Sequence, residues 1–156
     1  MSKPAACIAT LLLCVAQLGM SIANAQTPAA GGPRDGTIKA VQGSVTVVRD
    51  NVSTAAVVGG AVHSSDRIQT GEASATAITL MDGTVLSIGP SSEVELSAFQ
   101  FNPTTNEGNI LVRTLRGTLR MVTGLIAKLK PEQVKVTTPT AVIGVRGTDF
   151  IVDVHP

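Results

Sequence analysis

The stretch that decides the fold covers residues 137–152 and reads TTPTAVIGVRGTDFIV. Pro139 breaks the chain near its start, and a run of small and β-branched residues follows. Gly144 and Gly147 then separate that run from a second apolar segment. This placement of Pro and Gly excludes a helix and is typical of two short strands joined by a corner.

The chain from residue 36 onward repeats this pattern, with Gly, Asp or Asn between segments rich in Val, Ile and Thr. Several segments alternate apolar and polar residues, which is typical of half-buried antiparallel strands. The expected strands are 38–41, 44–49, 67–70, 75–81, 84–88, 94–99, 110–115, 118–123, 133–137, 141–145 and 150–154.

Local turn and helix signals complete the expected fold. Asp82-Gly83 predicts a hairpin with a two-residue loop, because this dipeptide accepts the positive backbone angles that such a loop requires. The one helical candidate is 124–130, which Pro131 ends. We therefore expect an all-β fold, a single domain of short antiparallel strands forming a sandwich or roll, with at most one short helix.

The N-terminus has the features of a secretory signal peptide. Lys3 precedes an apolar run at 5–20, and a small-x-small site ends at Ala25, before Gln26. The run is shorter than the roughly 20 apolar residues that a spanning helix needs, which favours cleavage between Ala25 and Gln26 over a retained anchor. We expect residues 1–25 to be removed and the protein to be periplasmic or secreted.

The remaining chain is divided into a Pro-, Ala- and Gly-rich flexible leader at 26–35 and one β domain at 36–156. Both cysteines, Cys7 and Cys14, lie in the signal segment, so disulfides are not expected to stabilise the exported domain. Without Lys3, the 12 basic residues fall to the same number as the 11 acidic ones. This balance, with no Trp or Tyr and three Phe, gives no support to a nucleic-acid partner.

Groups of residues with catalytic potential are few. The segment 63–66, His-Ser-Ser-Asp, holds the residue types of a hydrolase triad, but neighbours in one turn cannot take the geometry of that site. Glu93 and Glu95 share one face of a strand, which indicates its solvated side rather than an acid and base pair flanking a cleft. His63 and His155 have no metal-ligand spacing. We assign no catalytic, metal-binding or cofactor-binding residue and expect a protein that is not an enzyme and needs no cofactor.

One ordered set of residues joins the turns and strands of the chain: Asp66, Thr70, Gly71, Asp82, Gly83, Gly117, Thr138, Pro139, Gly144, Arg146, Gly147, Thr148, Asp149 and Phe150. In these residues and their order, the chain resembles the FecR-domain family from about residue 36 to residue 154. We expect them to be structural: Gly144 and Gly147 for backbone angles that a Cβ would forbid, Thr148 and Asp149 to satisfy turn groups, and Val142, Val145 and Phe150 for the core.

The resemblance implies two readings of function. Signalling members of the family are inner-membrane regulators that relay the occupancy of an outer-membrane transporter to a cytoplasmic anti-sigma segment. We expect this chain to lack such a segment and to be more similar to stand-alone exported members. We therefore expect an exported, non-catalytic interaction or scaffold module of the bacterial cell envelope.

The alternative is a membrane-anchored periplasmic sensor that modulates a transporter or a transmembrane regulator. The expected partner is an unknown envelope protein, or a second copy bound through an edge strand at 150–154. No nucleic acid is expected to bind, and no membrane span is expected after signal cleavage.

Overall fold

The computed structural model describes residues 34–147 and 149–155. The predicted signal peptide, its cleavage site between Ala25 and Gln26, and Thr148 lie outside the described residues. The strands are β1 (Gly36–Gln42), β2 (Val45–Arg49), β3 (Val52–Ala55), β4 (Ala61–Val62), β5 (Arg67–Thr70), β6 (Ala75–Leu80), β7 (Val85–Ile88), β8 (Glu93–Asn102), β9 (Glu107–Val122), β10 (Val134–Thr137), β11 (Val142–Gly144) and β12 (Asp149–Val154).

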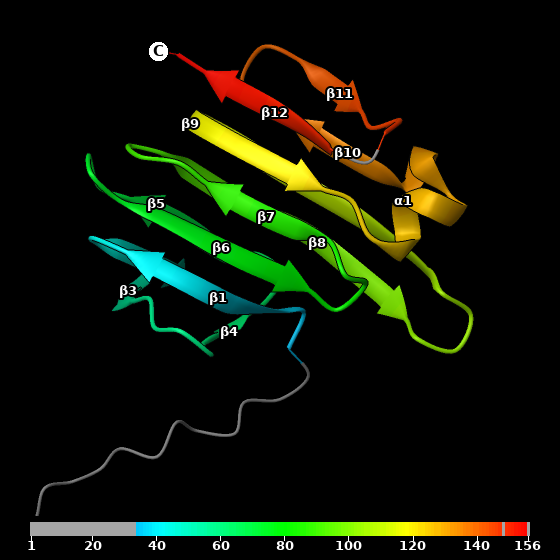
Figure 1. Ribbon diagram of the computed structural model, residues 1–156, viewed down its shortest axis with the longest axis horizontal. Coiled ribbons are helices and arrows are strands. Elements are labelled where there is room, and N and C mark those ends of the chain that lie inside the picture. The colour runs from blue at the N-terminus through cyan, green and yellow to red at the C-terminus, as the bar shows by residue number, and fades with distance from the viewer. Residues whose placement is uncertain (1–33, 148, 156) are drawn as a thin grey trace, which may run out of the picture. The chain divides into compact units, whose positions relative to one another are not determined.

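One short α-helix, α1 (Leu125–Leu129), and a 3-10 turn, η1 (Pro131–Gln133), follow β9 (Figure 1). The all-β prediction with at most one short helix is confirmed, and the helix ends before Pro131 as expected. None of the helices in the described part of the chain is long and apolar enough to cross a membrane.

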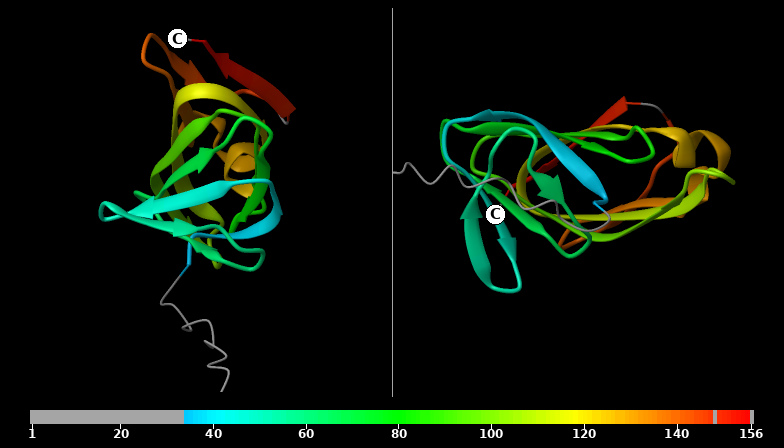
Figure 2. Two further views of the ribbon diagram at one scale, coloured as in Figure 1. Left: turned by 90° about the vertical axis from the view of Figure 1, so that its left-hand side faces the viewer. Right: turned by 90° about the horizontal axis from the view of Figure 1, so that it is seen from below.

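The strands form one sheet that folds over into two facing layers joined through β9 (Figure 2). Layer A holds β4, β1, β6, β7, the second half of β9 and β12, in that order. Layer B holds β3, β2, β5, β8, the first half of β9, β10 and β11. This is the roll that the sequence predicted.

The pairing is antiparallel except between β9 and β10, which run parallel with Val134 opposite Ile110. The purely antiparallel expectation is therefore wrong at this pair. The reason is that β9 bends back at Gly117. As a result, its last residues lie at the same end of the layers as its first residues. The chain then needs only α1 and η1 to cross from layer A to layer B and start β10 in the same direction.

β9 also replaces two predicted strands, 110–115 and 118–123, by one strand of 16 residues. The turn expected at Gly117 exists, but as a sharp bend with φ +79° inside a continuous strand. The Asp82-Gly83 hairpin is placed as predicted but has a three-residue loop. Leu80 accepts a bond from the Gly83 N–H at 3.0 Å and donates to the Thr84 carbonyl at 2.8 Å. Gly83 alone takes a positive φ in this loop.

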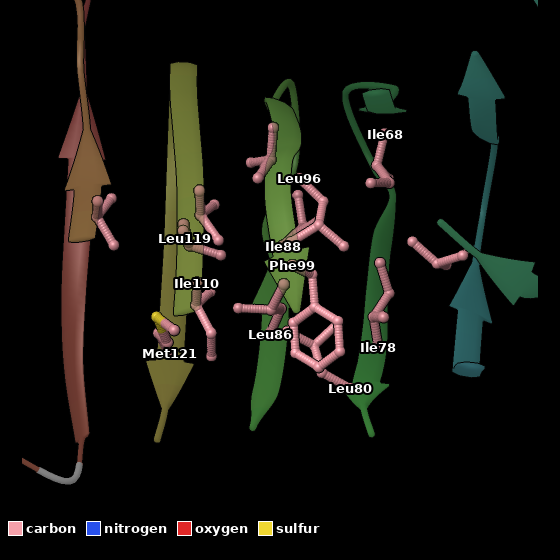
Figure 3. Close-up of a cluster of buried hydrophobic side chains, with 14 of the residues drawn as sticks. Ile68, Ile78, Leu80, Leu86, Ile88, Leu96, Phe99, Ile110, Leu119 and Met121 are labelled. Carbon is pink, nitrogen blue, oxygen red and sulfur yellow. The ribbon is translucent and has the colours of Figure 1, made fainter. Parts of the chain in front are cut away.

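The core fills the space between the layers. Alternate residues of each strand point inward, as the period of two requires, and Figure 3 shows aliphatic side chains from both layers meeting there. Ile78, Leu86 and Leu119 come from layer A, while Ile68 and Leu96 come from layer B, and each is at most 1% exposed. Burial of this apolar surface is the main stabilising contribution, since the described domain contains no cysteine.

Candidate functional site

The residues that carry the family resemblance lie at four places, and the first is the corner where the chain passes between the layers. At this end, the chain crosses between β5 and β6, between β7 and β8, and within β9. Thr70 Oγ donates to the Gly89 carbonyl at 2.6 Å and accepts the Ser92 N–H at 2.9 Å. The Gly71 carbonyl accepts the Ser91 N–H at 2.9 Å. Thr70 and Gly71 therefore tie two successive corners together.

Gly117 lies at the third of these corners, the bend within β9. Ser92 Oγ accepts the Thr118 N–H at 2.9 Å, and the Gly89 N–H donates to the Thr118 carbonyl at 2.9 Å. The Gly117 backbone lies so near Ser92 that no side chain fits between them. The three corners therefore form one hydrogen-bonded scaffold.

Asp66 forms the second place, at the turn before β5. Its carboxylate is fully buried and accepts two bonds from Arg49, Nε and Nη2, both at 2.6 Å. The His63 N–H adds a third bond at 2.8 Å. The bond with Asp66 raises the pKa of Arg49 above its ordinary value, against the opposing effect of burial. Both oxygens of Asp66 are thus engaged in a structural ion pair.

The same turn fixes the start of the domain. Asp35 Oδ2 accepts bonds from the Ser64 N–H at 2.6 Å and from Ser64 Oγ at 2.7 Å. The Asp35 N–H also donates to the Val62 carbonyl at 2.9 Å. Asp35, which the sequence analysis placed in the leader, is thus part of the fold.

Asp82 forms the third place, at the opposite end of the layers from the corners. Its buried carboxylate accepts the Thr84 N–H at 3.0 Å and the Thr84 hydroxyl at 2.7 Å. Thr84 Oγ accepts the Gly124 N–H at 3.0 Å, and the Asp82 carbonyl accepts the Leu125 N–H at 2.9 Å. Asp82 thereby attaches the start of α1 to the β6–β7 hairpin.

Glu93 and Glu95, the candidate acid and base pair, lie on the outer face of layer B among arginines. Arg67 bridges both carboxylates at 3.3 Å, while Arg113 and Arg116 approach from β9. Partial burial raises the pKa of Glu95, but hydrogen bonds from Ser97 and Arg67 and the charges of Arg113 and Arg67 outweigh it, so the net pKa is lowered. A carboxylate held ionised in this way is a poor general acid, and the pair forms a charged ladder across three strands.

The fourth place is the side of the domain where β12 is the edge strand of layer A and β11 is the edge strand of layer B. β12 pairs with β9 from Asp149 opposite Val122 to Val154 opposite Gly117. Its other side has no partner strand within residues 34–147 and 149–155. Ile151 is 64% exposed on its outer face, between Asp149 and Asp153. Arg120 holds Asp149 through two hydrogen bonds and lowers the pKa of that carboxyl.

A shallow groove of about 560 Å³ adjoins this edge on the outer face of layer A. Its lining is of small side chains, including Ala75, Ala77 and Ser87, with Arg120 at the side nearest β12. Across the strands, Ile151 lies opposite Arg120, and Arg120 opposite Ser87. The groove and the β12 edge therefore form one continuous surface, which no single sequence motif could indicate.

Residues 66–156 match the model of the family described as FecR protein. The chain belongs to the FecR family. A solved structure described as a cell surface anchoring domain is 31% identical, over 41% of this chain and 86% of that chain, with a TM-score of 0.39. None of the curated proteins compared with the chain matches it. The FecR match begins at Asp66, so β1 to β4 lie outside the matched residues.

The last part of the FecR motif differs from the sequence expectation. Gly144 and Gly147 have no positive φ, and a Cβ on either would meet nothing within 4 Å, so the expected backbone strain is wrong. Val142 is 72% exposed rather than in the core, because β11 is an edge strand and the side chain points outward. Val145 is buried, and Phe150 packs against the core while partly exposed.

Asp149 also has a different role from the one expected, since its carboxylate binds Arg120 rather than a turn. Thr138 accepts the Ala141 N–H at 3.0 Å, which closes the turn around Pro139 between β10 and β11. Arg146 is exposed beside a second hollow, which Pro131, Glu132 and Val145 also line. Across the described ranges, no group of three or more His, Cys, Asp or Glu could hold a metal ion.

Proposed function

We propose that this FecR-family chain is an exported, non-catalytic interaction module of the bacterial cell envelope that binds a partner protein along β12. The observation that carries the proposal is the one-sided pairing of β12 in the described domain, with Ile151 exposed between two aspartates. An open strand edge offers N–H and C=O groups that an extended segment of another protein can complete.

The charges on β12 favour a partner over a second copy at this edge. In a two-fold antiparallel pair centred on Ile151, Asp149 of each copy would stand opposite Asp153 of the other. Like charges directly opposite each other destabilise a sheet. A segment with basic, apolar and basic residues at alternate positions would place cations beside both aspartates and an apolar side chain beside Ile151.

The non-catalytic part of the proposal is supported by the state of the polar groups. The buried carboxylates of Asp66 and Asp82 are held by Arg49 and Thr84, and Glu93 and Glu95 by arginines. These groups are bound within the scaffold rather than directed into a shared cavity. Membership of the FecR family and the signal-like N-terminus support a place in the envelope.

The experiment is a titration of the protein with two short extended peptides by calorimetry. One peptide alternates threonine with lysine, valine and lysine, and the other has glutamate in place of lysine. We expect binding of the lysine peptide alone, lost in Ile151→Lys and retained in Val142→Lys, a matched change on the β11 edge. Equal binding of both peptides, or loss in both variants, would remove β12 as the binding edge.

Export is tested separately by the intact mass of the protein recovered from the envelope. A mass corresponding to a chain that begins at Gln26 supports the exported module. Retention of residues 1–25 would instead favour the alternative, an anchored periplasmic sensor.

A further inference from the structure

A second open edge lies at β3, the edge strand of layer B on the side opposite β11. In the described part of the chain β3 pairs only with β2, from Arg49 opposite Val52 to Thr46 opposite Ala55. All four residues of β3 are exposed, so neither face of the strand is covered. Figure 2 shows the β2–β3 hairpin standing out from the layers.

The turn that builds this hairpin makes the edge regular. Asp50 and Asn51 form the two-residue loop, with φ of 50° and 63°. Two successive positive values are the signature of a type I′ turn, whose twist matches that of paired strands. β3 is therefore paired in regular register with β2, and its outer backbone groups are available for another strand.

The β3 edge also lacks the charged residues that normally prevent an open edge from pairing with another chain. Residues 51–62 contain no Asp, Glu, Lys or Arg. Val57 and Val58, which follow β3, are 62% and 66% exposed, and Val52 is 64% exposed. Natural proteins usually place charged residues or Pro on open edges to prevent pairing between copies. β12 has Asp149 and Asp153 in such positions, whereas β3 has none.

We propose that β3 pairs antiparallel with β3 of a second copy of this chain, forming a two-fold dimer. With Ser53 at the axis, Val52 of each copy lies opposite Thr54 of the other. Asp50 of each copy then lies opposite Ala56 of the other, so the two acidic side chains stand at opposite ends of the contact. A neutral row gains nothing from a charged partner but is complementary to itself, and a two-fold contact closes on itself.

This contact is separate from the proposed binding at β12. β3 precedes the residues that match the FecR family and ends the strand order next to β2, whereas β12 lies off that path beside β9. Failure of dimerisation would leave the β12 proposal intact, and failure of peptide binding would leave the dimer intact.

Light scattering of the purified protein over a range of concentrations tests the dimer. We expect the mass to approach twice that of one chain. Thr54→Lys places a charge opposite Val52 of the other copy and should raise the dissociation constant at least about tenfold. Ile151→Lys, the matched change on β12, should leave the dimer unchanged.

Circular dichroism and the melting temperature establish that each variant is folded. A wild-type monomer at all concentrations, or a Thr54→Lys dimer as tight as wild type, would overturn the proposal. So would a mass that grows without limit and falls in Ile151→Lys, because that result would mean head-to-tail pairing of β3 with β12.

A cysteine at the axis gives a second measurement that needs no destabilising change. Ser53→Cys, with Cys7→Ser and Cys14→Ser, places two thiols on directly opposed residues, within the reach of a disulfide. We expect a covalent dimer on mild oxidation. Thr140→Cys in the same background is the control, since Thr140 is also exposed but lies in the β10–β11 turn. Equal cross-linking of both variants would contradict the pairing.

Discussion

Gly117 lies against Ser92 at the corner where β9 passes from layer B to layer A. Ser92 Oγ accepts the Thr118 N–H at 2.9 Å, and a Cβ on Gly117 would stand 2.6 Å from the Ser92 Cα. Gly117 also has φ +79°, which side chains other than glycine rarely adopt. Two independent physical requirements thus demand glycine at this position.

We expect Gly117→Ala to lower the free energy of unfolding by about 3 kcal/mol, because the methyl group adds a backbone clash to the strain of a positive φ. Denaturant unfolding followed by circular dichroism measures the change. Gly147→Ala is the matched control. Since a Cβ on Gly147 meets nothing within 4 Å, its effect should stay within about 0.5 kcal/mol. Equal losses in the two variants would show that the corner does not constrain Gly117.

Two ion pairs between arginine and aspartate test how burial of the carboxylate changes the contribution of the pair to stability. Arg49 and Arg120 each bind a carboxylate through Nε and Nη2, but the Asp66 side chain is fully buried while that of Asp149 is 44% exposed. Removing the cation from a buried carboxylate leaves an uncompensated charge, whereas exposed pairs contribute little.

We therefore expect Arg49→Met to cost about 2 kcal/mol or more, reduced from the full value for a buried pair because Arg49 itself is half exposed. Arg120→Met should cost much less, because both members of its pair are exposed to solvent. Thermal unfolding at neutral pH ranks the two variants. If Arg120→Met were the more damaging, burial of the carboxylate would not be the deciding factor.

The ladder around Glu95 predicts a loss of stability in acid. The pKa of Glu95 is lowered in the folded protein from an ordinary value of 4.5. Its contribution is therefore complete above about pH 4.5 and is lost as the pH falls through the folded pKa, where the carboxylate takes up a proton. Unfolding free energies measured at about pH 7 and about pH 3 should differ less in Glu95→Gln than in wild type. An identical difference in both proteins would mean that Glu95 carries none of the acid sensitivity.

The sequence predicted most strands because alternation and turn residues are local signals. The hairpin at Asp82-Gly83 and the short helix before Pro131 were placed correctly for the same reason. β3 and β4 were missed, since Val52–Ala55 has no buried face and Ala61–Val62 is too short to show a period. β4 pairs with β1, which is distant in the chain, so local pattern cannot reveal it. β3 pairs with its neighbour β2 through the Asp50-Asn51 turn, a local signal without the apolar alternation that marks the other strands.

The roles of the motif residues were harder to predict than their positions. Gly117 and Gly147 both precede Thr in the sequence, yet only Gly117 has a positive φ and a neighbour where its side chain would lie. The difference arises from Ser92, which is 25 residues away and reaches Gly117 only because the layers fold over. The open edge of β12 was anticipated from its apolar sequence, but the groove beside it requires four strands to be brought together.

Two buried threonines give a final test in which the same substitution should have different effects on stability. Thr84 and Thr114 are both 0% exposed. The Thr84 hydroxyl donates to the Asp82 carboxylate and accepts the Gly124 N–H, so it joins the β6–β7 hairpin to α1. The Thr114 hydroxyl finds no hydrogen-bond partner among the described residues.

Thr84→Val keeps the shape of the side chain but leaves a buried carboxylate and a buried N–H each short of a partner. We expect it to destabilise the domain by about 2 to 4 kcal/mol. Thr114→Val removes a buried hydroxyl that makes no bond, so it should be neutral or should stabilise by about 1 kcal/mol. Denaturant unfolding of the two variants beside wild type measures both signs. A clear destabilisation by Thr114→Val would show that its hydroxyl is bonded in solution, and a neutral Thr84→Val would mean that α1 is not held through Asp82.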